Sequence, residues 1–171
     1  LSQATTHQVA WDEMPTSKRA EILKKAADLL EERRGLFLSL LIEEAGKTLP
    51  DAVSELREAM DFCRYYAEEA VKHFETPQTL PGPTGELNQL LLRGRGVFAC
   101  ISPWNFPLAI FMGQVTAALV AGNGVIAKPA TATPLIAWHA IRALHEAGVP
   151  KEVLHLLHGP SKVFGTPLIE D

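Results

Sequence analysis

The fold is decided by residues 93–133, which begin RGRGVFACISPWNFP at 93–107 and end AGNGVIAKPATAT at 121–133. The pattern predicts a strand, a turn, a helix and a second strand, with polar side chains only where a strand stops. Residues 97–102 are apolar and rich in strand-forming side chains, as expected for a buried strand of a parallel sheet. Ligands of such sheets bind outside the carboxyl ends of the strands, so this layout predicts a site there.

The flanking sequence predicts a helical lead before this stretch and further strand-helix units after it. Apolar residues recur every three or four positions, which indicates amphipathic helices at 15–34, 36–45 and 50–73. Three prolines and two glycines in residues 76–85 predict a loop, followed by an extended run at 86–93. After the second strand, at 125–128, we expect a helix at 135–146, a strand at 153–157 and a short helix at 161–169. The prediction is an α/β chain with right-handed crossovers.

Composition excludes several classes of function. The chain has 171 residues, 47% of them hydrophobic, which fits one domain or one large piece of a bigger protein. A net charge of −4 without blocks of like charge argues against nucleic acid and anionic membranes as partners. The longest apolar run, 106–121, is shorter than the ~20 residues of a membrane-spanning helix. The amino terminus lacks the features of a signal peptide and begins like an excised piece. The presence of just two cysteines indicates a reducing, cytoplasmic location.

Two polar residues follow the predicted strands of the central stretch. Asn105 lies between a strand and a helix, where a side-chain amide and free backbone amides can form an oxyanion hole. Spacing alone favours the alternative that Asn105 shapes the turn or caps the helix. Lys128 ends the second strand and can donate hydrogen bonds to a ribose or a phosphate, although an exposed lysine at a strand end is also ordinary.

Other residue types favour structural interpretations. Cys63 and Cys100 fall in the middle of a helix and of a strand, and we expect both to be core residues. The acids of the 50–73 helix, including Glu55 and Glu58, resemble a solvated stripe that pairs with Arg57 or Arg64. The histidines form no metal-binding pattern, so no metal site is expected. The dinucleotide fingerprint Gly-x-Gly-x-x-Gly is absent.

Two blocks resemble the aldehyde dehydrogenase superfamily, and the spacing between them matches as well: ISPWNFP at 101–107 and GNGVIAKP at 122–129. Further stretches are similar to the L-glutamate γ-semialdehyde (Δ1-pyrroline-5-carboxylate) dehydrogenase module of bacterial proline utilisation A proteins. These are EAGKTL at 44–49, REAMDFCRYYA at 57–67 and GPTGELN at 82–88. The resemblance covers nearly all of the chain.

The resemblance implies an incomplete aldehyde dehydrogenase fold with a partial Rossmann-like sheet. Residues 1–80 would be the helical lead, 81–96 a loop and hairpin strand used for subunit association, and 97–171 the first half of the NAD-binding domain. Asn105 would stabilise the oxyanion of a thiohemiacetal, and Glu58 would lie near the aldehyde entrance. The cofactor would be bound by Ile101, Ser102, Pro103, Trp104, Lys128, Ala130, Thr131, Gly159, Ser161, Gly165 and Thr166.

The resemblance also implies what this chain lacks. The nucleophilic cysteine, general-base glutamate and pyrophosphate loop of the family have no match here, so the chain alone is expected to be inactive. It is expected to work with the remainder of an aldehyde dehydrogenase module. The resemblance further implies a homo-oligomer that acts on a small aldehyde. Thr131 stands where an acidic residue is usual, which leaves NADP open beside NAD. His158 and Ser161 also depart from the family pattern. A non-catalytic binding or assembly module, and self-association through an open sheet edge, remain alternatives.

Overall fold

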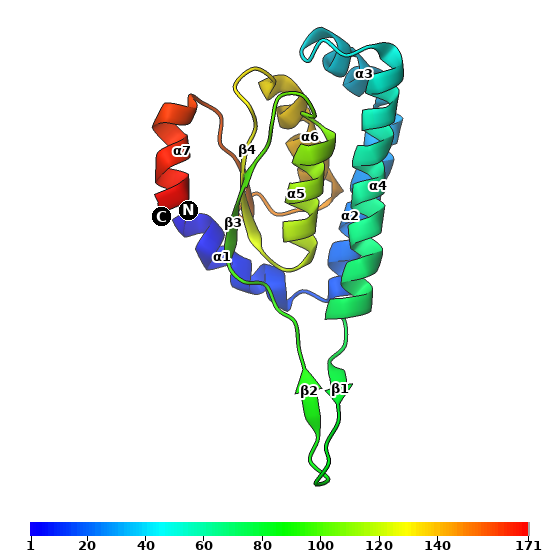
Figure 1. Ribbon diagram of the computed structural model, residues 1–171, viewed down its shortest axis with the longest axis vertical. Helices are drawn as coiled ribbons and strands as arrows, with labels where there is room; N and C mark the ends of the chain where they lie inside the picture. Colours follow the sequence, from blue (N-terminus) through cyan, green and yellow to red (C-terminus); the bar gives the residue numbers. More distant parts are fainter. Residues whose placement is uncertain (171) are drawn as a thin grey trace.

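The computed structural model describes residues 1–170, apart from the side chains of Ser161, Thr166, Pro167, Ile169 and Glu170. Four helices lead the chain, followed by a β-hairpin and three strand-helix units (Figure 1). In chain order the elements are α1 (Ser2–Glu13), α2 (Thr16–Glu32), α3 (Arg34–Glu43), α4 (Leu49–Phe74), β1 (Gln78–Leu80), β2 (Asn88–Leu90), β3 (Val97–Ile101), α5 (Ala109–Val120), β4 (Gly124–Lys128), α6 (Pro134–Ala147), β5 (Leu154–Leu156) and α7 (Ser161–Glu170).

The predicted α/β architecture is present. Strands β3, β4 and β5 form a parallel sheet in that order, so β4 is central. All five residues of β4 are buried, which explains their uninterrupted apolar sequence before Lys128. The register pairs Ile101 of β3 with Lys128 of β4, and therefore ends both strands at the same level.

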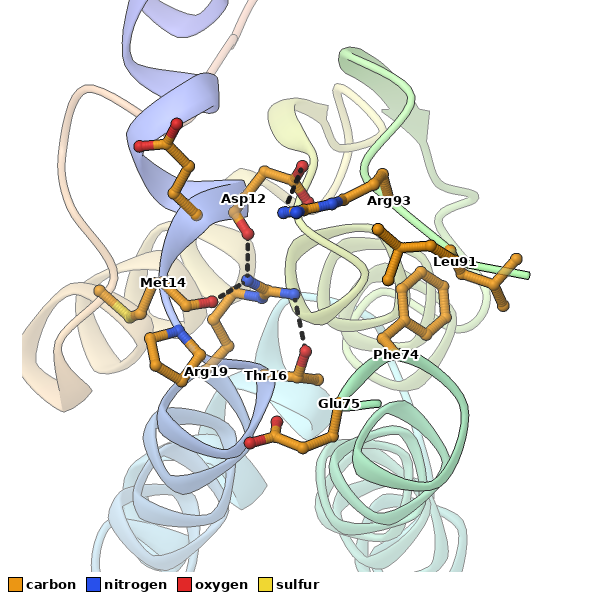
Figure 2. A pocket seen from close by; sticks show the side chains of 11 residues that line it. Asp12, Met14, Thr16, Arg19, Phe74, Glu75, Leu91 and Arg93 are labelled. Atoms are coloured by element: carbon orange, nitrogen blue, oxygen red, sulfur yellow. Dashed lines mark hydrogen bonds and ion pairs between the residues drawn. The ribbon is translucent and has the colours of Figure 1, made fainter. Parts of the chain in front are cut away.

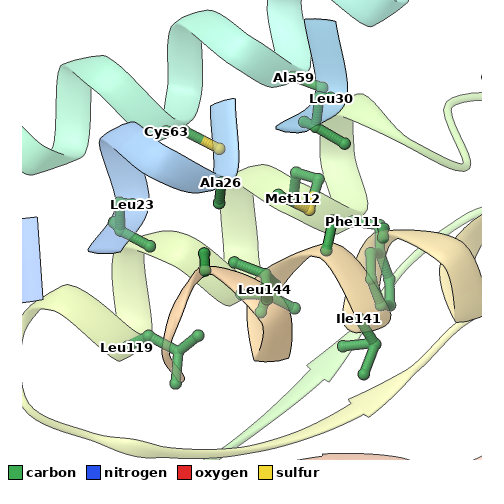
Figure 3. Packing of buried hydrophobic residues seen from close by; sticks show 14 of the residues in the cluster. Leu23, Ala26, Leu30, Ala59, Cys63, Phe111, Met112, Leu119, Ile141 and Leu144 are labelled. Carbon is green, nitrogen blue, oxygen red and sulfur yellow. The ribbon is translucent and has the colours of Figure 1, made fainter. Parts of the chain in front are cut away.

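One face of the sheet is covered by α5 and α6, and these helices pack in turn on α2 and α4. Figure 3 shows how the buried side chains of the four helices interlock. The residues drawn include Leu23 and Leu30 of α2, Cys63 of α4, Phe111 and Met112 of α5, and Leu144 of α6. The helical lead and the sheet therefore share one hydrophobic core, because the apolar stripes of α2 and α4 are buried against α5 and α6.

The expectation that residues 97–102 form a buried strand is wrong for most of the stretch, although Cys100 and Ser102 are buried. β3 lies at an edge of the three-stranded sheet, and Phe98 and Ile101 are 42% and 43% exposed. On the face away from α5, Val97 and Ala99 line a hollow of about 460 Å³ with Phe164 of α7. An apolar sequence therefore marked a strand correctly, but it could not distinguish a central strand from an edge strand.

Two elements were missed by sequence reasoning. The first 14 residues contain α1, whose buried Trp11 donates its indole N–H to the carbonyl of Leu119 at 2.8 Å. The stretch 76–85, expected to be a loop, contributes β1, which pairs antiparallel with β2. The resulting hairpin projects away from the body of the molecule (Figure 1) and exposes apolar side chains, among them Leu80, Leu87 and Leu90.

The segment that follows this hairpin is tied to the core through Asp12 of α1, which is held in turn by Arg19 of α2. Arg19 is 2% exposed, and it donates hydrogen bonds to the carbonyl oxygens of Val120 at 2.9 Å and Asp12 at 2.9 Å. Its other acceptors include Met14 and Thr16, as Figure 2 shows. Asp12 in turn accepts a hydrogen bond from the N–H of Gly94 at 2.8 Å. The hollow of about 280 Å³ beside this cluster is thus lined by groups that hold together α1, α2 and the chain segment before β3.

Candidate functional site

The two motif blocks meet at the carboxyl ends of β3 and β4. The N–H of Ser102 donates to the carbonyl of Lys128 at 3.2 Å, which extends the strand pairing by one residue. The chain then leaves the sheet on each side through a loop, 103–107 after β3 and 129–133 after β4. Residues that are 26 positions apart in the sequence therefore share one end of the sheet, as the strand pattern predicted.

The loop after β3 presents both apolar and polar groups. Trp104 is 60% exposed and Asn105 is exposed, whereas Ser102 is only 6% exposed. The hydroxyl oxygen of Ser102 has no hydrogen-bond partner among the described residues. Because a buried polar atom is costly to leave unpaired, this hydroxyl is suited to meet a ligand at the strand end. Pro103 is half-buried between these residues.

Asn105 does not cap the helix that follows it. The N-terminus of α5 receives no hydrogen bond from a flanking side chain, and the Asn105 amide makes no hydrogen bond within the described part of the chain. The helix-cap alternative raised by spacing is therefore wrong. The amide is left exposed at the strand end, where it can donate to a ligand oxygen.

Glu55 of α4 supplies the cap instead. Its Oε1 accepts from the backbone N–H groups of Leu108 at 2.8 Å and Ala109 at 3.2 Å, although Glu55 lies more than 50 residues earlier. The residue is 1% exposed, so the prediction that it belongs to a solvated stripe paired with Arg57 or Arg64 is wrong. A buried carboxylate is tolerated here because orphan amides and the positive end of the α5 dipole surround it.

Lys47 is the counter-ion of Glu55. Its Nζ lies 2.6 Å from Glu55 Oε2, and the lysine side chain is 12% exposed. This ion pair is the partner of Oε2, which makes no further hydrogen bond among the described residues. The same ammonium lies 4.0 Å from the ring centroid of Phe106, a cation–π contact with the residue next to Asn105.

The loop after β4 brings part of the expected cofactor group together. Lys128 is 3% exposed, and its Nζ donates to the carbonyl of Pro129 at 3.4 Å. The alternative that Lys128 is an ordinary exposed lysine is therefore wrong, and burial fixes this ammonium at the strand end. The hydroxyl of Thr131 reaches the carbonyl of Gly159 at 3.5 Å, which joins the loops after β4 and β5. Ala130 is half-buried between them.

The remaining expected cofactor residues lie just before α7 or within it. Gly159 has φ of +152°, and a Cβ there would collide with the ring of Phe164, so this position requires glycine. Gly165 lies half-buried within α7. The side chains of Ser161 and Thr166 fall outside the described part of the structure.

Glu58 lies apart from this group on the exposed side of α4. It lines an open groove of about 710 Å³ with Arg57, Asp61 and Phe62. No hydrogen bond or ion pair joins Glu58 to the loop of Asn105 among residues 1–170. The two are connected through Glu55, which is one helical turn before Glu58 and contacts the start of α5.

Both cysteines are buried in the core, as predicted. Burial raises the pKa of the Cys63 thiol to about 12 and that of Cys100 to about 11. A thiolate is the reactive form, so neither residue is suited to nucleophilic chemistry in this structure. Within the described residues no group of three or more potential metal ligands forms, and none of the helices there is long and apolar enough to cross a membrane.

These thiol pKa values predict a pH dependence of stability. The folded chain holds the two protons more tightly than the unfolded chain, whose thiols titrate near 9.0. The stabilisation is fully present below that pH and is lost as the pH rises toward the folded values. We therefore expect the free energy of unfolding in urea to fall between about pH 8 and pH 10.5, and to fall less in a Cys63→Ala/Cys100→Ala variant. Equal pH slopes for the two proteins would contradict the assignment.

Asn123 illustrates a structural residue whose role the sequence concealed. Its Oδ1 accepts from the N–H groups of Arg95 at 2.5 Å and Gly96 at 3.1 Å, and its Nδ2 donates to the carbonyl of Ala118 at 3.1 Å. The Gly-Asn-Gly turn thus fastens the start of β3 to the end of α5. The flanking glycines indicated a turn, but nothing in the local sequence revealed the partners.

Comparison with known proteins reveals extensive similarity. The model of the aldehyde dehydrogenase family matches residues 1–171. The bifunctional protein PutA of Klebsiella aerogenes is 43% identical over 171 residues, which are 100% of this chain and 12% of that protein. The chain therefore spans about an eighth of the length of this curated relative.

Solved structures agree with the sequence comparison. A variant of proline utilization A (PutA) from Bradyrhizobium japonicum superposes with a TM-score of 0.96 at 55% identity, over 99% of this chain and 17% of that one. The 1-pyrroline-5-carboxylate dehydrogenase from Thermus, solved with bound NAD, has a TM-score of 0.93 at 35% identity, over 98% of this chain and 33% of that one.

Proposed function

This chain belongs to the aldehyde dehydrogenase family, and on that premise we propose that it forms one wall of the active-site cleft of an NAD-dependent dehydrogenase. The proposed reaction is oxidation of L-glutamate γ-semialdehyde to L-glutamate, a step of proline catabolism. The assignment of the substrate is supported by the similarity to PutA and to 1-pyrroline-5-carboxylate dehydrogenases. The family requires a nucleophile and a general base, which we assign to the remainder of an aldehyde dehydrogenase module.

The observation that carries the proposal is the meeting of both motif blocks at one end of the sheet. The Ser102–Lys128 hydrogen bond aligns the loop of Asn105 with the buried ammonium of Lys128. An exposed amide that is not engaged by any described residue of the chain is the donor that a developing oxyanion needs. We assign this role to Asn105, and a place near the aldehyde entrance to Glu58.

The residues at this end of the sheet fit a dinucleotide. Lys128 and Thr131 offer donors for ribose hydroxyls, and the unpaired hydroxyl of Ser102 offers a further polar contact. Ile101 and Trp104 are exposed apolar surfaces that can cover a flat ring. We propose that these residues bind NAD together with Pro103, Ala130, Gly159, Ser161, Gly165 and Thr166. Bound NAD would supply the hydride acceptor, and this chain would hold and orient it.

The proposed reaction is tested by mixing the intact protein that carries this chain with NAD and L-glutamate γ-semialdehyde. We expect NADH to appear, as absorbance at 340 nm, only when the aldehyde is present. Absence of aldehyde-dependent NADH formation would overturn the assignment. Parallel assays with benzaldehyde test whether the aldehyde must carry the amino-acid head group.

Binding of the cofactor gives a second prediction, on Lys128. We expect Lys128→Ala to weaken NAD binding about tenfold in isothermal titration calorimetry, because one charge-assisted hydrogen bond to the ribose is lost. Lys151→Ala, at an exposed position, is the matched control and should bind NAD like the unaltered chain. Equal affinities for all three proteins would remove Lys128 from the cofactor site. Titration with NADP in the same experiment tests whether Thr131, in place of the usual acidic residue, allows NADP to bind.

A second candidate function is a non-catalytic binding or assembly module. Burial of both cysteines favours it, since the chain offers no reactive thiol of its own. The projecting hairpin, with its exposed leucines, favours subunit association and a homo-oligomer. NAD binding without turnover by the intact protein would support this function over the first.

A further inference from the structure

The position of Asn105 depends on the two ends of a short loop, because its own side chain makes no hydrogen bond to any other residue that the structure describes. One end is fixed by the sheet, through the Ser102–Lys128 hydrogen bond at 3.2 Å. The other end enters α5 at Leu108 and Ala109. Whatever fixes the start of α5 therefore also sets the direction in which the Asn105 amide points.

The start of α5 has no cap of its own. The residues that lead into it, 106–108, are Phe, Pro and Leu, which offer no side-chain acceptor for the first helical amides. These amides are satisfied by Glu55 Oε1, at 2.8 Å and 3.2 Å. A carboxylate on another helix thus determines where α5 begins.

Lys47 extends this arrangement to the loop itself. Its ammonium lies 2.6 Å from Glu55 Oε2 and 4.0 Å from the ring centroid of Phe106. One cation therefore neutralises the buried carboxylate and contacts the residue that follows Asn105. Removing either member of the pair leaves the other as an uncompensated charge in a site of low exposure. The loop would then have to move to let water reach that charge.

We infer that the Lys47–Glu55 ion pair is a positioning device that holds Asn105 in the geometry required for oxyanion stabilisation. The inference rests on the proposed function, because it assigns the pair a role in that reaction. Neither residue touches the reacting atoms, and both act through the loop of Asn105. Misplacement of a catalytic group by about 1 Å can cost about 100-fold in rate.

A second carboxylate in the chain provides a matched control. Glu44 caps α6 in the same manner, accepting from the N–H groups of Leu135 at 2.8 Å and Ile136 at 3.0 Å. Glu44→Gln therefore removes a charge from a comparable cap. The helix concerned follows β4, so this variant should not act through Asn105.

A double-mutant cycle on the intact protein tests the inference. We expect Glu55→Gln to lower kcat about 10- to 100-fold, while the dissociation constant of NAD changes less than about twofold. In an Asn105→Ala background, Glu55→Gln should cause no further loss, because the group that it positions is gone. Any effect of Glu44→Gln on kcat should add fully to that of Asn105→Ala. Lys47→Met should repeat the coupling seen for Glu55→Gln, and it serves as the second variant if Glu55→Gln does not fold.

The outcomes separate this inference from the proposed function. If Asn105→Ala lowers kcat but the effect of Glu55→Gln and Lys47→Met is absent or fully additive, the pair only stabilises the fold and the inference is overturned. If Asn105→Ala leaves kcat unchanged, the oxyanion role in the proposed function is overturned instead.

Discussion

Replacement of Asn105 by alanine is expected to lower kcat by about 10²- to 10³-fold in the intact protein, the range seen when one oxyanion donor is removed. The amide is exposed at the end of β3 and donates no hydrogen bond within the described residues, so its loss removes little from the folded state. We therefore expect the melting temperature and the affinity for NAD to stay close to those of the unaltered protein. Steady-state kinetics at saturating NAD and aldehyde provide the measurement.

Two companion variants sharpen this experiment. Asn105→Asp keeps the shape of the side chain but places a carboxylate where negative charge develops, and its kcat should be no higher than that of the alanine variant. Asn88→Ala removes an asparagine whose amide donates to Pro81 and Glu86 in the hairpin, and should leave kcat unchanged. A kcat for Asn105→Ala within about twofold of the original would refute the oxyanion role.

Replacement of Arg19 by methionine is expected to cost about 3–5 kcal/mol of unfolding free energy. Each buried acceptor left unpaired costs about 1–3 kcal/mol, and rearrangement or entering water recovers a part. Burial lowers the pKa of Arg19 from its ordinary value, while Asp12 and Glu75 oppose that effect, and the guanidinium remains charged. The cost would lower the melting temperature by about 10 °C for a chain of this size.

An exposed arginine at the far end of α2 provides a matched control for this loss. Arg34 is largely exposed and pairs with Glu31 at 3.3 Å, so Arg34→Met should change stability by less than about 0.5 kcal/mol. Urea denaturation followed by circular dichroism measures both variants. A loss below about 1 kcal/mol for Arg19→Met would mean that the carbonyl groups find other partners readily, and that Arg19 does not hold the junction of α1 and α2.

The elements with strong local patterns could be predicted from the sequence. The apolar run before Lys128 indicated β4, and the three- and four-residue spacing in α2 and α4 indicated helices. These signals are local, because burial of one face repeats with the period of the backbone. The motif blocks around Asn105 and Lys128 were likewise sufficient to indicate the family and the end of the sheet at which a site lies.

Only the tertiary structure decided which charged residues are interior and what they hold. Glu55, Glu58 and Asp61 have the same local appearance in the sequence, yet Glu55 alone of the three is buried, because the amides of α5 lie opposite it. Arg19 likewise donates to Val120, 101 residues away, in addition to acceptors near it in the sequence. The environment that makes a buried charge tolerable comes from atoms distant in the chain, and residue spacing carries no information about them. The sequence by itself thus determined the strands of the parallel sheet, the helices other than α1 and the chemical groups of the candidate site, and the packing of α4 against α5 determined how the loop of Asn105 is held.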